Sequence, residues 1–157
     1  MDNVGEKMPS QDIMTKEEIH NFGIEVVSNQ LLKEGHQIKS TNDKIGINPQ
    51  IVAIINGKLS FIAVRTDCYP KKGKLSRQEH FQMIEHSEEH SARPYFASVG
   101  IANADCKTDS ERSVAVKGAG FHISYTGLLV ITQSDRVKVW DKDGIHKLAD
   151  SEIIDYE

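Results

Sequence analysis

Several basic side chains stand close together near the middle of the 157-residue chain. They follow a hydrophobic segment and are Lys71, Lys72, Lys74 and Arg77. Cations in such a run can track a phosphate backbone, which makes DNA or RNA the first ligand to consider. The alternative is a solvated loop, which the acidic balance of the whole chain favours.

Two histidines, His86 and His90, stand four residues apart, a spacing at which two imidazoles on one helix face can share a metal ion. The acids between them belong on an exposed face, and the sequence fixes no third ligand. Cys68 and Cys106 are isolated from one another, which favours two reduced thiols over a zinc site or a disulfide. We therefore predict no metal site here and expect no cofactor.

Two capping boxes mark the helices that would carry part of this chemistry. In such a box, each of two polar side chains satisfies a backbone N–H of the first helical turn. The boxes are Thr15 with Glu18, and Ser76 with Glu79. Apolar residues at three- and four-residue steps follow each box, so we predict helices over 16–34 and from 77 to about 91.

A hairpin is the most distinct strand signal. Two β-branched runs within 48–66 flank Asn56 and Gly57, a pair that readily adopts positive φ and so favours a type I′ turn. Pro49 cannot donate a hydrogen bond to a neighbouring strand, so the first strand should start at about that position.

The other segments complete a mixed pattern. We predict strands at 36–40 and 94–102, followed by a loop over 102–112. Further strands are predicted in 121–131 and in 136–148, the latter with a turn at Asp143 and Gly144, and an acidic tail follows at 150–157. Periodicity does not decide between helix and strand for 113–120. The resulting order suits a mixed sheet covered by helices, which is α/β in class with a β-rich C-terminal part.

The composition indicates one domain over 1–157, with 38% hydrophobic and 27% charged residues. No apolar run approaches the ~20 residues that span a bilayer, so we expect no membrane association. The start, 1–14, has no apolar core and is interpreted as a lead-in to the first helix, which leaves the cytoplasm as the default location. The net charge of −4 argues against non-specific coating of nucleic acid, although a local basic patch is compatible with it.

The segments "GIEVVSNQLLKEGHQI" and "PQIVAIINGKLSFIAVRT" together resemble the PD-(D/E)XK, or restriction-endonuclease-like, superfamily. They are most similar to its small bacterial branch, which is related to archaeal Holliday junction resolvases. The resemblance covers a nuclease-like core at about 15–102 and leaves 103–157 as a β-rich extension. It implies a site in which two carboxylates on adjacent strands hold Mg²⁺ against a phosphate while a lysine orients water. It also implies a DNA contact for Gln78, on the helix where several branches keep a glutamine, although an exposed helix residue is the alternative.

All three positions that the resemblance assigns to this site depart from the pattern. Gln50 takes the place of the aspartate, Ala63 that of the glutamate and Arg65 that of the lysine. A neutral amide is a weak ligand, a methyl group is none, and a fixed guanidinium repels a divalent ion. The exchange instead favours a phosphate or carboxylate, which Arg65 with Gln50 could hold.

Three functions remain open from the sequence. The leading one is a catalytically inactive binding module for nucleic acid, another anion or a protein partner. The second is an active Mg²⁺-dependent nuclease that uses migrated acids, for which Glu25, Asp67 and Asp43 are candidates. Against it, Asp67 at a strand end more often pairs locally, with Arg65 or with the following turn. The third is a structural or assembly role, with a homodimer formed through a sheet edge.

Overall fold

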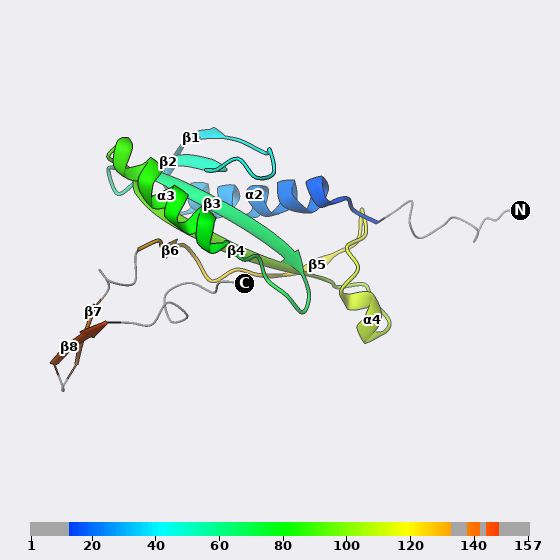
Figure 1. Ribbon diagram of the computed structural model, residues 1–157. Helices are drawn as coiled ribbons and strands as arrows, with labels where there is room; N and C mark the ends of the chain where they lie inside the picture. The colour runs from blue at the N-terminus through cyan, green and yellow to red at the C-terminus, as the bar shows by residue number, and fades with distance from the viewer. Residues whose placement is uncertain (1–12, 133–137, 142–143, 148–157) are drawn as a thin grey trace, which may run out of the picture.

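A six-stranded mixed sheet with a helix on each face forms the centre of the protein (Figure 1). The computed structural model describes residues 13–132, 138–141 and 144–147. Helix α2 (Lys16–Lys33) packs on one face and helix α3 (Arg77–Glu89) on the other. The predicted α/β class is therefore confirmed.

The sheet combines a meander with one parallel pair. Strands β1 (Gln37–Thr41), β2 (Ile51–Ile55) and β3 (Lys58–Cys68) pair antiparallel in sequence order. Strand β4 (Arg93–Asn103) lies parallel to β3, after a crossover through α3. Strands β5 (Phe121–Ser124) and β6 (Leu129–Val130) both pair antiparallel with β4. A short helix, α4 (Asp109–Arg112), lies between β4 and β5, and β7 (Lys138–Asp141) with β8 (Gly144–Lys147) forms a separate two-stranded sheet.

Local sequence signals explain where the main elements begin and turn. Both predicted capping boxes are present, at the first turns of α2 and α3. Asn56 and Gly57 have φ values of 51° and 78°, so the β2–β3 turn has the positive φ at both positions that a type I′ turn requires. The predicted hairpin is confirmed, although β2 starts at Ile51 rather than at about Pro49.

Alternation along β3 divides the core into two layers. Ile62 and Val64 face α2, whereas Phe61 and Ala63 face α3. Thr66 lies directly against Gly23 of α2, where a Cβ atom would stand 1.6 Å from the Thr66 hydroxyl oxygen. The absence of a side chain at Gly23 therefore lets α2 approach β3 closely. On the opposite face of β3, the residue that follows Ala63 in the alternation is Arg65, which points toward α3.

The structure differs from the sequence prediction after β4. The segment predicted as a loop at 102–112 contains α4, and 113–120 is neither helix nor strand apart from one bridge between Val116 and Ile13. The predicted strand region 121–131 divides into β5 and β6 because both pair with different parts of β4. Residues 1–12 of the predicted lead-in and the acidic tail at 150–157 lie outside the described residues. Among the helices described, none is long and apolar enough to cross a bilayer.

Candidate functional site

Two of the three positions that the resemblance assigned to metal chemistry, Gln50 and Arg65, lie in one hydrogen-bonded polar network. The Gln50 side chain is fully buried. Its Oε1 accepts hydrogen bonds from the Val64 N–H at 2.7 Å and from Arg65 at 3.1 Å, and its Nε2 donates to the Ile47 carbonyl and to Asn48 Oδ1, both at 3.0 Å. The amide therefore has protein partners for both its oxygen and its nitrogen.

The Arg65 guanidinium is held in the same network. It donates to the Val64 carbonyl at 2.8 Å and to Asn48 Oδ1 at 2.9 Å, and it forms an ion pair with the Glu79 carboxylate. Its side chain is only 16% exposed. Ala63 beside it is fully buried against α3 and offers no ligand atom.

Glu79 is the member of this network that sequence analysis assigned only to helix capping. One carboxylate oxygen accepts hydrogen bonds from Ser76 in the capping box, while the other accepts from Arg65 and Asn48. Burial by itself raises the pKa of this carboxyl, but the charge and hydrogen bonds of Arg65, together with Asn48 and Ser76, outweigh burial and hold the pKa below its usual value. Glu79 is thus ionised and neutralises Arg65.

The candidate acids of a migrated metal site do not assemble. Glu25, Asp43 and Asp67 are all exposed, and none of them belongs to a metal-sized group of three potential ligands within the described part of the chain. Asp67 Oδ1 accepts a hydrogen bond from the Cys68 N–H at 2.7 Å, which matches the local structural role considered for it, whereas its other suggested partner, Arg65, pairs with Glu79.

The loop after β3 creates a second and different environment. It folds back over the sheet and is fixed at Gly73, whose N–H donates to the Val99 carbonyl at 3.1 Å and whose carbonyl accepts from Ser98 Oγ at 2.7 Å. A Cβ atom at Gly73 would stand 1.9 Å from the Arg65 carbonyl oxygen, so only glycine permits this close passage. The anchored loop presents Lys71 and Lys72 at the ends of β3 and β4.

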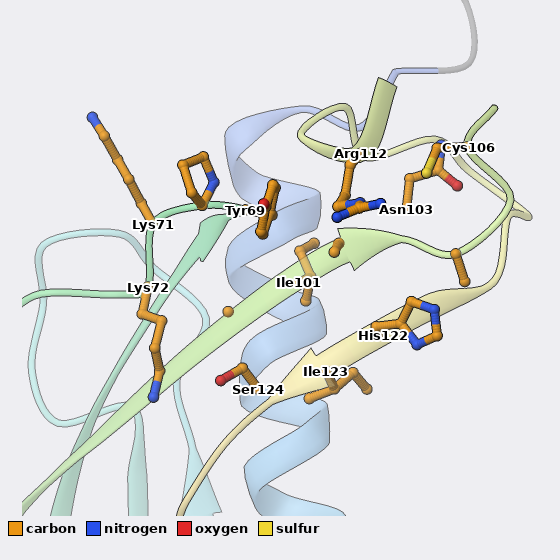
Figure 2. Close-up of a pocket in the computed structure, with 14 residues that line it drawn as sticks. Tyr69, Lys71, Lys72, Ile101, Asn103, Cys106, Arg112, His122, Ile123 and Ser124 are labelled. Atoms are coloured by element: carbon orange, nitrogen blue, oxygen red, sulfur yellow. The ribbon is translucent and has the colours of Figure 1, made fainter. Parts of the chain in front are cut away.

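A cavity of about 640 Å³ lies at this end of the sheet (Figure 2). It is bounded by the loop after β3, the ends of β4 and β5, and α4. The polar and aromatic side chains that line it are Tyr69, Lys71, Lys72, Asn103, Cys106, Arg112, His122 and Ser124. None of the described residues that line the cavity is acidic. Two smaller cavities, of about 320 and 440 Å³, are also lined by Lys71 and Lys72.

Tyr69 and Arg112 form one wall of the cavity. The Arg112 guanidinium carbon lies 5.3 Å from the centre of the Tyr69 ring, a cation–π distance, and Figure 2 shows the two side chains side by side. Hydrogen bonds with Cys106 and Tyr69, followed by the nearby charge of Asp109, raise the pKa of Arg112 further above its already high value. Tyr69 is 40% exposed, so this wall offers an accessible aromatic surface beside a guanidinium that pairs with Asp109 at 3.2 Å.

The lysines of the cavity differ from Arg65 in their partners. Within the described residues, Lys71 and Lys72 make no ion pair, and Lys71 is exposed. The Lys72 stem passes over Gly100, where a Cβ atom would stand 3.0 Å from Lys72 Cγ. Of the other residues predicted to contact phosphate, Lys74 lines the two smaller cavities, and Arg77 and Gln78 are exposed in the first turn of α3.

The lysines could be recognised in the sequence, but the opposite wall of the cavity could not. Arg112 and His122 carry no motif that links them to the basic run, and Tyr69, two residues before Lys71, carries none that marks it as a binding surface. They converge because β4 lies between β3 and β5, so the C-terminal end of β3 and the start of β5 lie at the same end of the sheet.

Comparison with known proteins gives one match. The profile of a family described as a domain of unknown function (DUF8840) matches residues 17–131. This range begins in the first turn of α2 and ends just after β6, so it coincides with the helices and the six-stranded sheet and excludes β7 and β8. No curated protein and no solved structure was found to match the chain.

Proposed function

The chain belongs to the family described as a domain of unknown function, DUF8840, and we propose that it is a non-catalytic module that binds single-stranded nucleic acid. The observation that carries the proposal is the cavity at the ends of β3 and β4, whose charged lining within the described residues is cationic. In sheets with parallel strands, ligands commonly bind beyond the carboxyl ends of those strands, and β3 and β4 are the parallel pair here.

Phosphate groups fit the charge of this cavity. Lys71 and Lys72 lie on one side and Arg112, which also pairs with Asp109 at 3.2 Å, lies on the other, so a bound strand would meet cations on two sides. In a chain with a net charge of −4, this concentration of positive charge is local, and it favours a ligand seated at one place over non-specific coating.

The exposed ring of Tyr69 favours single strands over duplexes. Unpaired bases stack on aromatic side chains and on guanidinium planes, and both surfaces lie together here. His122 and Asn103 add hydrogen-bonding groups along the cavity. The combination of lysines for phosphates with an aromatic surface for a base supports a single strand as the ligand.

The proposal excludes magnesium-dependent cleavage at the nuclease-like positions. The order of helix, three antiparallel strands, helix and parallel strand supports the resemblance to PD-(D/E)XK proteins that the sequence suggested. The residues at the expected site do not fit Mg²⁺. The side-chain oxygen of Gln50 already accepts two hydrogen bonds, and the nearby Glu79 carboxylate is paired with Arg65. The proposal keeps the cytoplasmic location expected from the sequence, and both cysteines are free thiols.

Fluorescence anisotropy with labelled single-stranded DNA, single-stranded RNA and duplex DNA tests the proposal. The full chain should bind a single strand more tightly than the duplex, and the affinity should fall as salt rises from roughly 50 to roughly 200 mM. The double variant Lys71→Ala/Lys72→Ala should bind more weakly and should reduce the slope of log K against log salt by about 1.4, since a single strand contributes about 0.7 per phosphate contact.

The matched control is Lys39→Ala/Lys44→Ala, which removes the same charge from exposed positions outside the cavity. Equal weakening by both double variants would show that net charge, and not the cavity, governs binding. Absence of binding to any nucleic acid would refute the proposal and leave a protein partner or an assembly role, including a homodimer. Cleavage of plasmid DNA with Mg²⁺ that is lost in both Asp67→Ala and Glu25→Ala would establish the nuclease alternative.

A further inference from the structure

We propose that His86, Glu89 and His90 form a binding site for one divalent transition-metal ion, such as Zn²⁺, at the C-terminal end of α3. This site is separate from the cavity and independent of the proposed function. The structure supplies the third ligand that the sequence alone did not fix.

The three side chains gather their donor atoms in one place. One imidazole nitrogen from each histidine and one carboxylate oxygen of Glu89 lie within 4.8 Å of one another, and the two imidazole rings are 4.7 Å apart between centres. Ligands of a tetrahedral Zn²⁺ lie about 2.0–2.2 Å from the ion and therefore about 3.4 Å from one another, so binding requires the donor atoms to close by up to about 1.4 Å. Glu89 and His90 are exposed, so small rotations of their side chains can achieve this closure.

The backbone already orients one imidazole for coordination. His90 Nδ1 lies 3.0 Å from the His86 carbonyl oxygen, which is an acceptor only, so Nδ1 carries the proton and donates. The Nε2 lone pair is then available for a metal. A metal-binding histidine commonly has this arrangement, in which the second ring nitrogen donates to a carbonyl and fixes the tautomer.

A buried phenylalanine supports both rings. The Phe61 ring centre is 5.1 Å from the His86 ring and 5.6 Å from the His90 ring, and Phe61 itself is buried in the α3 layer of the core. The imidazoles are therefore packed against a rigid surface on one side and exposed to solvent on the other. This packing reduces the conformational entropy that the rings would lose on binding a metal.

The end of the helix adds favourable electrostatics. His86, Glu89 and His90 occupy the last turn and C-cap of α3, at the negative pole of the helix dipole. A cation is stabilised at this pole, and the Glu89 carboxylate lies 4.0 Å from His86 Nδ1 on the same side. Neighbouring groups thus favour a positive ion over the anion that the cavity favours.

The donor set defines the class of metal. Two imidazoles and one carboxylate suit Zn²⁺, Cu²⁺ or Ni²⁺, whereas Mg²⁺ and Ca²⁺ prefer oxygen ligands. Three protein ligands leave at least one coordination position for water or an external group. His86 also borders a small cavity of about 220 Å³, shared with Asn48 and Gln82, which leaves room beside the site.

Isothermal titration calorimetry of the full chain without an affinity tag, using Zn²⁺ and Cu²⁺ in turn, tests the site. We expect one ion to bind per chain, and we expect the Cu²⁺ complex to show nitrogen coupling from two imidazoles in its electron paramagnetic resonance spectrum. His90→Ala and Glu89→Gln should each weaken binding by at least about tenfold, because changes even beyond the direct ligands commonly have an effect of that size. Both changes are on exposed side chains, so the fold should persist by circular dichroism.

Glu85→Gln is the matched control, since Glu85 is an exposed acid on the same helix outside the cluster. His122→Ala controls for histidine content elsewhere. Binding that is retained in His90→Ala and lost in His122→Ala would overturn the assignment. So would the failure of the full chain to bind either ion at millimolar concentration, or a Cu²⁺ spectrum that His90→Ala leaves unchanged.

Discussion

The polar network around Arg65 and the cavity around Lys71 and Lys72 are close in the sequence but differ in how their positive charge is compensated. Arg65 is mostly buried, pairs with Glu79 and donates to three further oxygen acceptors. Lys71 and Lys72 line cavities and make no ion pair within the described residues. A buried charge must be paired to be tolerated, whereas an exposed lysine keeps its hydration and can exchange it for a phosphate.

This difference separates a structural role from a binding role. Removing one member of the Arg65 network leaves a buried group without its partner, so the cost appears in the stability of the fold. Removing a side chain from the cavity leaves nothing unpaired in the interior, so the cost appears in ligand affinity. Variants in the two regions should therefore have opposite signatures.

The largest expected effect is on stability. Glu79→Ala removes the counter-charge of Arg65 and a member of the α3 capping box, and it should lower the free energy of unfolding by ~3 kcal/mol, as for other broken pairs with limited exposure. Urea unfolding measures this change. Glu85→Ala on the exposed face of α3 should cost less than about 0.5 kcal/mol. Similar losses in both variants would mean that the network is not stabilising.

Tyr69→Ala should show the reverse signature. Loss of one base-stacking surface is expected to weaken binding of single-stranded nucleic acid by about tenfold, at the lower end of ~1–3 kcal/mol per stacked base, with little change in urea unfolding. Phe81→Ala is the matched control, because Phe81 is 43% exposed on α3 and does not line the cavity. If Tyr69→Ala binds single-stranded nucleic acid as tightly as the unmodified chain, Tyr69 does not stack on a base of the ligand.

A smaller effect is expected in the pH dependence of stability, which tests the region around Arg65. Burial, and then the charge of Arg65, lower the pKa of His20 below 6.5, with Asp43 acting in the opposite direction. Below about pH 6.5 the His20 side chain binds more protons in the unfolded chain than in the folded chain. The contribution of His20 to the free energy of unfolding should therefore be constant above about pH 6.5 and fall as the pH decreases below it.

Urea unfolding at about pH 7.5 and about pH 5.5 measures the His20 contribution. His20→Gln should lose less stability between these pH values than the unmodified chain. His36→Gln, at a partly exposed histidine, should retain the full loss. The Glu79 carboxyl does not interfere, because its pKa is depressed from 4.5 and its contribution is lost only at more acidic pH.

The smallest expected effect tests how precisely the cavity is built. Gly100→Ala places a methyl group 3.0 Å from Lys72 Cγ and 3.3 Å from the Lys71 carbonyl oxygen, so the Lys72 side chain and the loop that carries both lysines should shift. We expect a loss of affinity of about twofold to threefold, with no more than about 1 kcal/mol lost in unfolding. Gly120→Ala, whose added Cβ would meet its nearest neighbour at 3.7 Å, should leave affinity unchanged.

Much of the core could be predicted because its signals are local. The capping boxes at Thr15 and Ser76 involve residues three positions apart, and the hairpin turn depends on the φ preferences of two adjacent residues. Helix α4 was missed because four residues are too few to show a helical period. The division of 121–131 into two strands depends on pairing with β4, which no local signal specifies.

The amino-acid sequence by itself determined which residues could form each helix, the β2–β3 turn and the run of lysines, because these features depend on neighbours within about four residues. Only the tertiary structure decided which cations are compensated. It brought Glu79 of α3 to Arg65 of β3, and it placed Arg112 and His122 opposite the lysines. The physical reason is that charge compensation depends on distance in space, which is set by the packing of α3 on the sheet and by strand pairing rather than by separation along the chain.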